Sequence, residues 1–215
     1  PQYSNIITVT VLPAVTTANA GPDTHVCFTT ATILAANTPT NGTGSWSVLP
    51  GAPSAVTFTN PNNPNSTVNG LVVGTYQFVW TISNGTCDDS NDTVTITVDP
   101  QTAPGTLSAS TTVCATANSG TLSLTGFTGN ILHWEASTDN GTSWNNIPNT
   151  TSTINFTNLS TTTQYRVAVQ SGVCAPQYSN IVTVTVLPAV TTANAGTDTH
   201  ICFTTATILA ANTPT

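Results

Sequence analysis

Alternating apolar and polar residues dominate the chain. The runs Ile6–Val11 and Thr93–Val98 alternate Val or Ile with Thr, and Tyr165–Val169 has an apolar residue at every second position. A period of two places the apolar side chains on one face of a strand, and Val, Ile and Thr are favoured there. No segment shows the 3.6-residue stripe of an amphipathic helix. The pattern predicts an all-β protein with half-buried strands.

Turn signals separate these runs. Asn-Gly pairs occur at 41–42, 69–70, 84–85 and 140–141. Short strands divided by turns at intervals of roughly 8–12 residues are typical of a β-sandwich. For the first sandwich we expect seven strands, near 24–28, 31–37, 44–49, 55–59, 66–71, 75–83 and 92–98.

The sequence repeats itself. Residues 1–40 recur as residues 176–215, and only three positions differ: Ile7/Val182, Pro22/Thr197 and Val26/Ile201. Because Pro1 corresponds to Pro176, the chain contains one full period, 1–175, and the beginning of the next. Such self-similarity indicates a tandem array.

Cysteine spacing divides the period in two. Cys27 and Cys87 have the same separation as Cys114 and Cys174, and Cys202 is the repeat equivalent of Cys27. Pro13, Pro100 and Pro188 mark the joints, where proline gives stiff connections. We therefore expect the last strand of a preceding Ig-like domain at 1–12, sandwiches at 13–99 and 100–187, and the first strands of the next repeat at 188–215.

An even pair of cysteines in each domain, with no metal-type CxxC motif, indicates disulfides and an oxidising compartment; free thiols are the alternative. The spacing predicts the pairs Cys27–Cys87 and Cys114–Cys174, one in each domain, with the partner of Cys202 beyond residue 215. Closing a loop of about 60 residues stabilises a domain by about 4 kcal/mol in the chain-entropy model.

Charge excludes some functions. The chain has one basic and eight acidic residues, giving a net charge of −7. A single Arg makes no basic footprint for nucleic acid, and no apolar run is long enough to span a membrane. Lysine, which commonly protects exposed strand edges, is absent, so we expect the ladders at 93–98 and 180–186 to be edges that contact other copies of the protein. The alternative is that Thr hydroxyls and attached glycans keep these edges solvated.

Two segments resemble known domain families. Leu159–Tyr165 resembles the tyrosine corner of fibronectin-III and Ig-like sandwiches, and Gly74–Phe78 with the final strand is similar to PKD-like domains. The PKD hallmark Gly-Asp-Gly after Trp46 is replaced by Ser47–Pro50. Together the two domains resemble the tandem-repeat surface proteins of Bacteroidota, exported by the type IX system. This resemblance implies an extracellular, cell-surface adhesin without catalytic residues or cofactors.

Residues after Cys87 suggest a metal site and a glycosylation site. Asp88, Ser90 and Asp92 have the opening spacing of a calcium loop, although the Gly and distal Glu of an EF-hand are missing. A solvated hairpin turn is the alternative. Asp92-Thr93-Val94 resembles the O-glycosylation signal of Bacteroidota, which makes Thr93 a candidate acceptor.

Other polar motifs have structural interpretations. Ser137–Trp144 resembles an Asp-box, which is either a glycan site or a brace for its hairpin. His25 and its equivalent His200 are expected on strand surfaces, and His133 and Glu135 to face solvent. Glu135 is the only Glu, whereas glycosidases need two flanking carboxylates. We therefore do not expect an enzyme.

The leading functional hypothesis is a structural repeat segment of a long extracellular fibre or of the stalk of a surface adhesin. Near-identity of successive periods is typical of a spacer. The alternative is an adhesion module that binds glycans or proteins weakly and gains strength through many copies.

Overall fold

The computed structural model describes residues 1–2, 4–115, 117–198, 200 and 209–213. These residues form sixteen β-strands and no helix. The described part of the chain therefore contains no helix that could cross a membrane. They divide into two compact units. Unit 1 comprises 1–104, 126–130 and 169–177, and unit 2 comprises 105–125, 131–168 and 178–215. The all-β prediction is confirmed.

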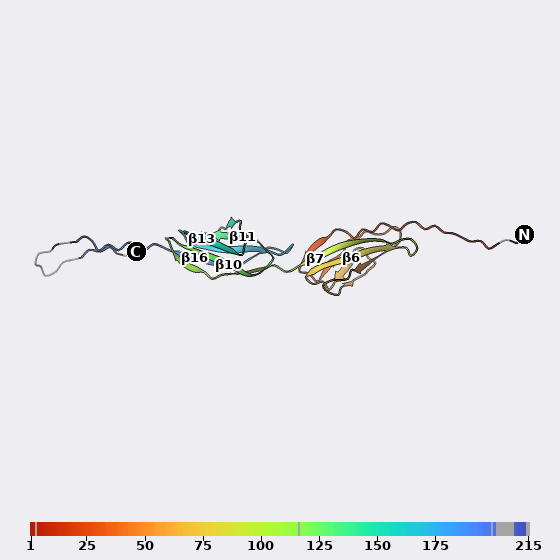
Figure 1. Ribbon diagram of the computed structural model, residues 1–215, viewed down its shortest axis with the longest axis horizontal. Coiled ribbons are helices and arrows are strands. Elements are labelled where there is room, and N and C mark those ends of the chain that lie inside the picture. Colours follow the sequence, from red (N-terminus) through yellow and green to blue (C-terminus); the bar gives the residue numbers. More distant parts are fainter. Residues whose placement is uncertain (3, 116, 199, 201–208, 214–215) are drawn as a thin grey trace. The chain divides into compact units, whose positions relative to one another are not determined.

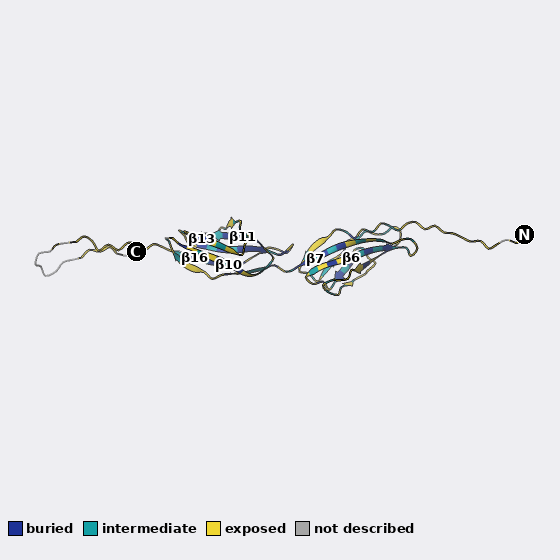
Figure 2. Cartoon of the chain, in the orientation of Figure 1, coloured by how far each residue is buried: buried dark blue, intermediate teal, exposed yellow. Residues whose placement is uncertain are grey.

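The first sheet of unit 1 pairs its two longest strands (Figure 1). Its spatial order is β1 (Thr24–Cys27), β7 (Ser90–Asp99), β6 (Gly74–Ser83) and β3 (Thr43–Val48). β1 is parallel to β7, whereas β6 is antiparallel to both β7 and β3. Buried residues alternate with more exposed ones along β6 and β7, as the sequence pattern predicts (Figure 2).

A second sheet of unit 1 has the order β2 (Ala31–Ile33), β5 (Thr67–Asn69) and β4 (Thr57–Phe58). The core draws on both sheets. Trp80, Tyr76 and Phe78 of β6 are fully buried with Leu34 and Val68, and the Trp46 and Trp80 rings lie 5.0 Å apart. All seven strands expected in this sandwich are present, although β2, β4 and β5 are shorter than predicted.

The remaining strands form a larger and a smaller sheet. The larger has the order β12 (Asn145–Ile147), β11 (Asn130–Ser137), β14 (Thr163–Gln170), β16 (Val182–Leu187) and β9 (Thr111–Cys114), and β15 (Gln177–Tyr178) pairs with β14. The smaller has the order β13 (Thr153–Thr157), β10 (Ser119–Thr128) and β8 (Ala103–Leu107). Trp134, Val167 and Val184 are completely buried in this core.

The two ladders expected to be sheet edges are interior strands. β7 lies between β1 and β6, and β16 lies between β14 and β9. The edge prediction is therefore wrong. The short strands β1 and β9 pair in parallel with β7 and β16, respectively. This pairing satisfies the backbone hydrogen-bonding groups that an edge strand would expose.

One sequence adopts two structures. Residues 182–187 form β16, which pairs with β14 and β9. Their repeat equivalents, 7–12, differ only at the first position, but form no strand and are exposed. The alternating pattern therefore encodes a strand only where partner strands supply its hydrogen bonds.

Local contacts also recur with the sequence repeat. The Asn37 N–H donates to the Asn19 carbonyl at 2.9 Å, and the Asn212 N–H donates to the Asn194 carbonyl at 3.1 Å. The side chain of Asn37 accepts from the Asn19 N–H, as Asn212 does from Asn194. The residues described near the C-terminus thus repeat the first contacts of unit 1.

The structure corrects the predicted cysteine pairing. Cys27 is bonded to Cys174, while Cys87 and Cys114 are free thiols. Cys27 is in register with Asp99 at the end of β7, whereas Cys87 precedes the start of that strand at Ser90. Ten extended residues span about 30 Å, far beyond the roughly 7 Å Cα separation that a disulfide allows. The prediction failed because equal spacing is equally compatible with pairing within each half of the period and with pairing between its two halves.

Candidate functional site: the Cys27–Cys174 disulfide

The first half of this site is the end of β1. Parallel pairing places Cys27 opposite Asp99, and the Phe28 N–H donates to the Asp99 carbonyl at 2.9 Å. Phe28 has a φ of 30°, and its side chain is 61% exposed. The chain therefore turns sharply directly after the cysteine, which fixes the end of the strand.

The second half is the segment after β14. Gly172 has a φ of 47°, a conformation that glycine adopts at low cost. The Cys174 N–H donates to the Ser171 carbonyl at 2.8 Å, and the Gln170 side chain donates to the Cys174 carbonyl at 2.9 Å. Cys174 Sγ lies 3.4 Å from the Pro100 carbonyl oxygen. This turn holds Cys174 buried, 4.8 Å from Cys27 between Cα atoms.

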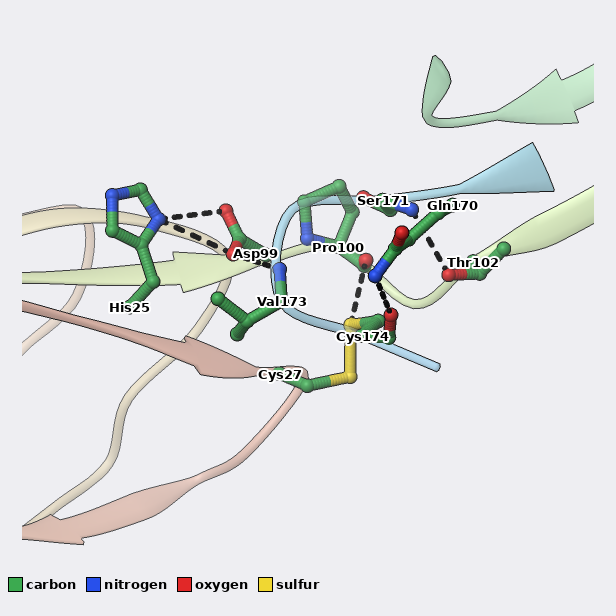
Figure 3. The surroundings of a disulfide bond; sticks show 9 residues. All are labelled: His25, Cys27, Asp99, Pro100, Thr102, Gln170, Ser171, Val173 and Cys174. Atoms are coloured by element: carbon green, nitrogen blue, oxygen red, sulfur yellow. Dashed lines mark hydrogen bonds and ion pairs between the residues drawn. A yellow bond between two sulfur atoms is a disulfide. The ribbon is translucent and has the colours of Figure 1, made fainter. Parts of the chain in front are cut away.

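Asp99 connects the two halves (Figure 3). One carboxylate oxygen accepts the Val173 N–H at 3.0 Å, and both oxygens lie 3.3 Å from Nδ1 of His25. Asp99 is buried, and a side chain at Gly172 would collide with its carboxylate. Because a hydrogen bond to a charged group is among the stronger ones in proteins, Asp99 fixes the turn that carries Cys174.

Sequence reasoning missed Asp99. The triplet Val98-Asp99-Pro100, which ends β7, corresponds to Val186-Leu187-Pro188, which ends β16. A carboxylate that replaces an apolar residue at an otherwise matched position was the available signal. His25, expected only on a strand surface, is half exposed and contacts this carboxylate.

A polar cleft of about 240 Å³ opens beside the disulfide. It is lined by Cys27, Gln101, Thr102, Pro104, Cys174, Ala175 and Gln177. Cys27 is exposed and Cys174 is buried, so the disulfide meets solvent on the Cys27 side. Thiol–disulfide exchange is the chemistry that such a bond offers.

The calcium candidates do not converge on a site. The Asp92 carboxylate accepts the Ala20 N–H at 2.7 Å, and the Ser90 hydroxyl accepts the Ala18 N–H at 2.8 Å. Asp88 is exposed. Within the described ranges no three potential metal ligands cluster. Ser90 and Asp92 instead attach residues 18–20 to β7.

The other candidates are separate from the disulfide. Thr93 is exposed on β7, opposite Val79 of β6. His200 is exposed, and Cys202 lies outside the described residues.

Glu135 does not face solvent as expected. It is 9% exposed, its carboxylate accepts Nε–H of Arg166 at 2.5 Å, and His133 Nε2 lies 3.3 Å from it. The Arg166 guanidinium lies 4.1 Å from the ring centres of both Trp144 and Tyr178. The only Arg of this lysine-free chain is thus paired and stacked, which the sequence pattern did not reveal.

The Asp-box braces its hairpin. Asp139 accepts the Ser143 N–H at 2.9 Å and the hydroxyls of Ser143 and Ser137 at 2.5 and 2.7 Å. These hydrogen bonds, those of Ser143 first, lower the pKa of Asp139 from 3.8 to about 2. All three donors belong to the same turn, so the carboxylate is engaged internally.

The tyrosine-corner bond belongs to the other domain. The Tyr76 hydroxyl accepts the Val72 N–H at 2.9 Å and donates to the Val72 carbonyl at 3.3 Å. No such bond of Tyr165 is seen among the described residues, and burial raises the pKa of its hydroxyl. A tyrosine that bonds back to the backbone a few residues upstream is a hallmark of Ig-type sandwiches.

Comparisons with known proteins agree with this architecture. The K319L-like PKD domain family matches residues 20–98, and a domain family of unknown function (DUF8696) matches residues 103–188. No curated protein shows significant similarity. The PKD domain of the KIAA 1837 protein is 29% identical to the chain, with a TM-score of 0.36, and the match covers 41% of this chain and 91% of that one.

Two further solved structures match larger parts of the chain. Extracellular domains 3–5 of Drosophila OTK are 9% identical, with a TM-score of 0.51, and the match covers 80% of this chain and 63% of that one. Murine CEACAM1b is 17% identical, with a TM-score of 0.49, and the match covers 76% and 96% respectively. The OTK likeness shows the fold alone. The chain therefore has the fold of tandem Ig-like β-sandwich domains, and its residues 20–98 are similar to PKD domains.

Proposed function

We propose that the chain is a structural repeat segment of a long extracellular fibre or of the stalk of a surface adhesin. The observation that carries this proposal is the disulfide between Cys27 of the PKD-like segment and Cys174 of the following segment. It joins the two halves of one sequence period covalently, in addition to the backbone at Pro100. A spacer under tension benefits from such a second connection.

Compartment and fold class support the same proposal. Disulfides persist mainly in oxidising surroundings outside the cytosol. PKD and Ig-like folds are typically non-catalytic binding or structural domains. The resemblance to Bacteroidota tandem-repeat proteins supports export to the cell surface by the type IX system, with other copies of the same repeat as the main partners.

The fibre proposed here is a continuous succession of repeats in one polypeptide. The near-identity of successive periods, which differ at only three of the positions compared, supports it. So does the recurrence of the Asn19–Asn37 contacts at Asn194–Asn212. β7 and β16 are interior strands, so neither offers a free edge for lateral pairing between copies.

Electron microscopy of the secreted native protein tests this function. We expect filaments with a regular axial repeat that corresponds to one full period of the sequence, 1–175. Filaments in oxidising buffer that become irregular after reduction would link the architecture to the disulfide. Native material consisting only of short, separate particles would contradict a fibre or stalk.

An apolar hollow favours a second candidate, an adhesion module that binds proteins or glycans. The hollow measures about 360 Å³ and is lined by Phe28, Thr29, Thr30, Leu71, Val72, Val73 and Val98. Phe28 and Val72 are 61% and 49% exposed, and in the proposed tandem array each period would present one such hollow, which favours avidity.

Glycan and protein arrays probed with the chain test this candidate. Specific binding that is lost in Phe28→Ser, but kept in the control Leu132→Ser on the other unit, would support the adhesion module. Leu132 is also partly exposed and does not line the hollow. Binding that is unaffected by Phe28→Ser would exclude this hollow as the site.

A further inference from the structure

Each free cysteine occupies, in one half of the period, the position that a bonded cysteine occupies in the other half. Cys27 ends β1 in parallel register with Asp99, and Cys114 ends β9 in parallel register with Leu187. The residue after each cysteine donates its N–H to that register partner, Phe28 to Asp99 at 2.9 Å and Ala115 to Leu187 at 2.8 Å. Cys114, which is exposed, therefore has the same backbone setting as Cys27.

Cys87 and Cys174 match in the same way. Cys174 Sγ lies 3.4 Å from the Pro100 carbonyl oxygen, and Cys87 Sγ lies 3.7 Å from the Pro13 carbonyl oxygen, 74 residues earlier in both cases. Glycines with positive φ, Gly172 and Gly85, precede them by two residues. The Cys174 N–H donates to the Ser171 carbonyl and the Cys87 N–H to the Asn84 side-chain oxygen, each at 2.8 Å and each three positions earlier in the chain. The turn that holds Cys87 is thus equivalent to the turn that holds the disulfide-bonded Cys174.

From this equivalence we propose that every junction between consecutive domains of the array carries a disulfide, and that Cys87 and Cys114 are the two halves of the second kind of junction. Cys114 bonds to the equivalent of Cys87 in the following period, and Cys87 bonds to the equivalent of Cys114 in the preceding one. The inference rests on the proposed tandem array.

The spacing fits this proposal. The known bond spans 147 residues. Counted forward by one period, the next equivalent of Cys87 lies only one position further from Cys114 than Cys174 lies from Cys27. In forming the second bond, two thiols lose two protons and two electrons to a disulfide oxidant, which is itself reduced to two thiols.

The two kinds of junction differ in chemistry. In the first, Asp99 accepts the Val173 N–H at 3.0 Å. In the second, Leu187 takes the place of Asp99. The Thr86 N–H, which is equivalent to the Val173 N–H, already donates to the Asn84 side chain at 3.1 Å. The turn around Cys87 therefore caps itself and does not need a carboxylate from the neighbouring domain.

Extending the chain tests the proposal. Because residues 176–215 repeat 1–40, adding a copy of residues 41–187 after Thr215 completes a second period. The extended protein is produced under oxidising conditions, its free thiols are alkylated, and its peptides are mapped without reduction. We expect Cys27–Cys174, Cys202 bonded to the added copy of Cys174, and Cys114 bonded to the added copy of Cys87. The original Cys87 should be alkylated.

Two variants make the result decisive. In Cys114→Ser the added copy of Cys87 should become alkylated while Cys27–Cys174 is retained, and Cys27→Ser should leave the Cys114 bond intact. Alkylated Cys114 in the extended protein, or Cys114 bonded to Cys87 of its own period, would overturn the inference. Because the readout is a linked peptide, it can succeed or fail independently of whether native filaments are seen.

Discussion

Cys27 and Cys174 are separated by 147 residues in the sequence and by 4.8 Å between their Cα atoms. The bond closes most of the chain into one covalent loop. A force applied to the two ends passes through the sulfur atoms, so the residues inside the loop carry no tension while the bond is intact.

Single-molecule stretching can measure this shielding. The oxidised chain should extend only through the residues outside the loop, whereas reduction should release about 500 Å of additional contour length at about 3.4 Å per residue. Cys27→Ser should show the long extension without reductant, and the control Cys114→Ser should behave like the unmodified chain. Equal contour lengths with and without reductant would mean that the bond does not form.

Asp99 can be replaced by the residue at its repeat-equivalent position. Asp99→Leu removes the part-buried hydrogen bond from the Val173 N–H to a carboxylate, and hydrogen bonds to charged groups contribute about 1.5–3 kcal/mol of stability. We expect lower stability in denaturant and faster reduction of Cys27–Cys174 by a small thiol. Asp88→Ala, at an exposed position, should change the stability by less than about 0.5 kcal/mol. An unchanged reduction rate in Asp99→Leu would show that Asp99 does not hold the turn.

Arg166 neutralises the mostly buried Glu135. Arg166→Met should destabilise the protein by about 3 kcal/mol, because it leaves a carboxylate with only His133 nearby and removes the guanidinium between two rings. The double variant Glu135→Gln/Arg166→Met should regain much of this loss in urea unfolding. If the double variant were no more stable than Arg166→Met, the stacking on Trp144 and Tyr178 would be the dominant contribution.

The Asp139 hairpin should respond to acid. Its folded pKa of about 2 is below the ordinary 3.8, so its contribution to stability is complete above about pH 4 and is lost as the pH falls toward 2. The protection of the Ser143 amide hydrogen, measured by NMR as its exchange rate relative to the intrinsic rate at each pH, should decrease over this range. Asp139→Asn should show low protection at every pH; a carboxyl resonance that titrates near 3.8 would contradict the lowered pKa.

Thr93 remains a predicted O-glycosylation site. Its exposed side chain on β7 is accessible, and Asp92 precedes it as the motif requires. Native material should have an intact mass above that of the polypeptide, and the excess should map to the Thr93 peptide and disappear in Thr93→Val. A native mass equal to the peptide mass would remove the prediction.

Much of the fold could be predicted because neighbouring residues set the two faces of a strand. The alternation in Gly74–Ser83 and Ser90–Asp99 shows which side chains face the core once partner strands are in place, and turn residues set the strand limits. The candidate site was less predictable. Asp99, His25 and Val173 meet through contacts between residues that are far apart in the sequence, and no local pattern specifies such contacts.

The sequence by itself determined the all-β class, the period that restarts at Pro176 and the equivalence of the cysteines in the two repeats. Only the tertiary structure decided which cysteines pair and which strands are interior. In a repeat, a bond within one domain and a bond to the next have nearly the same sequence signature. The ends of a strand about 30 Å long distinguish them, because Cys27 and Cys87 lie at opposite ends of β7 while Cys174 lies beside Cys27.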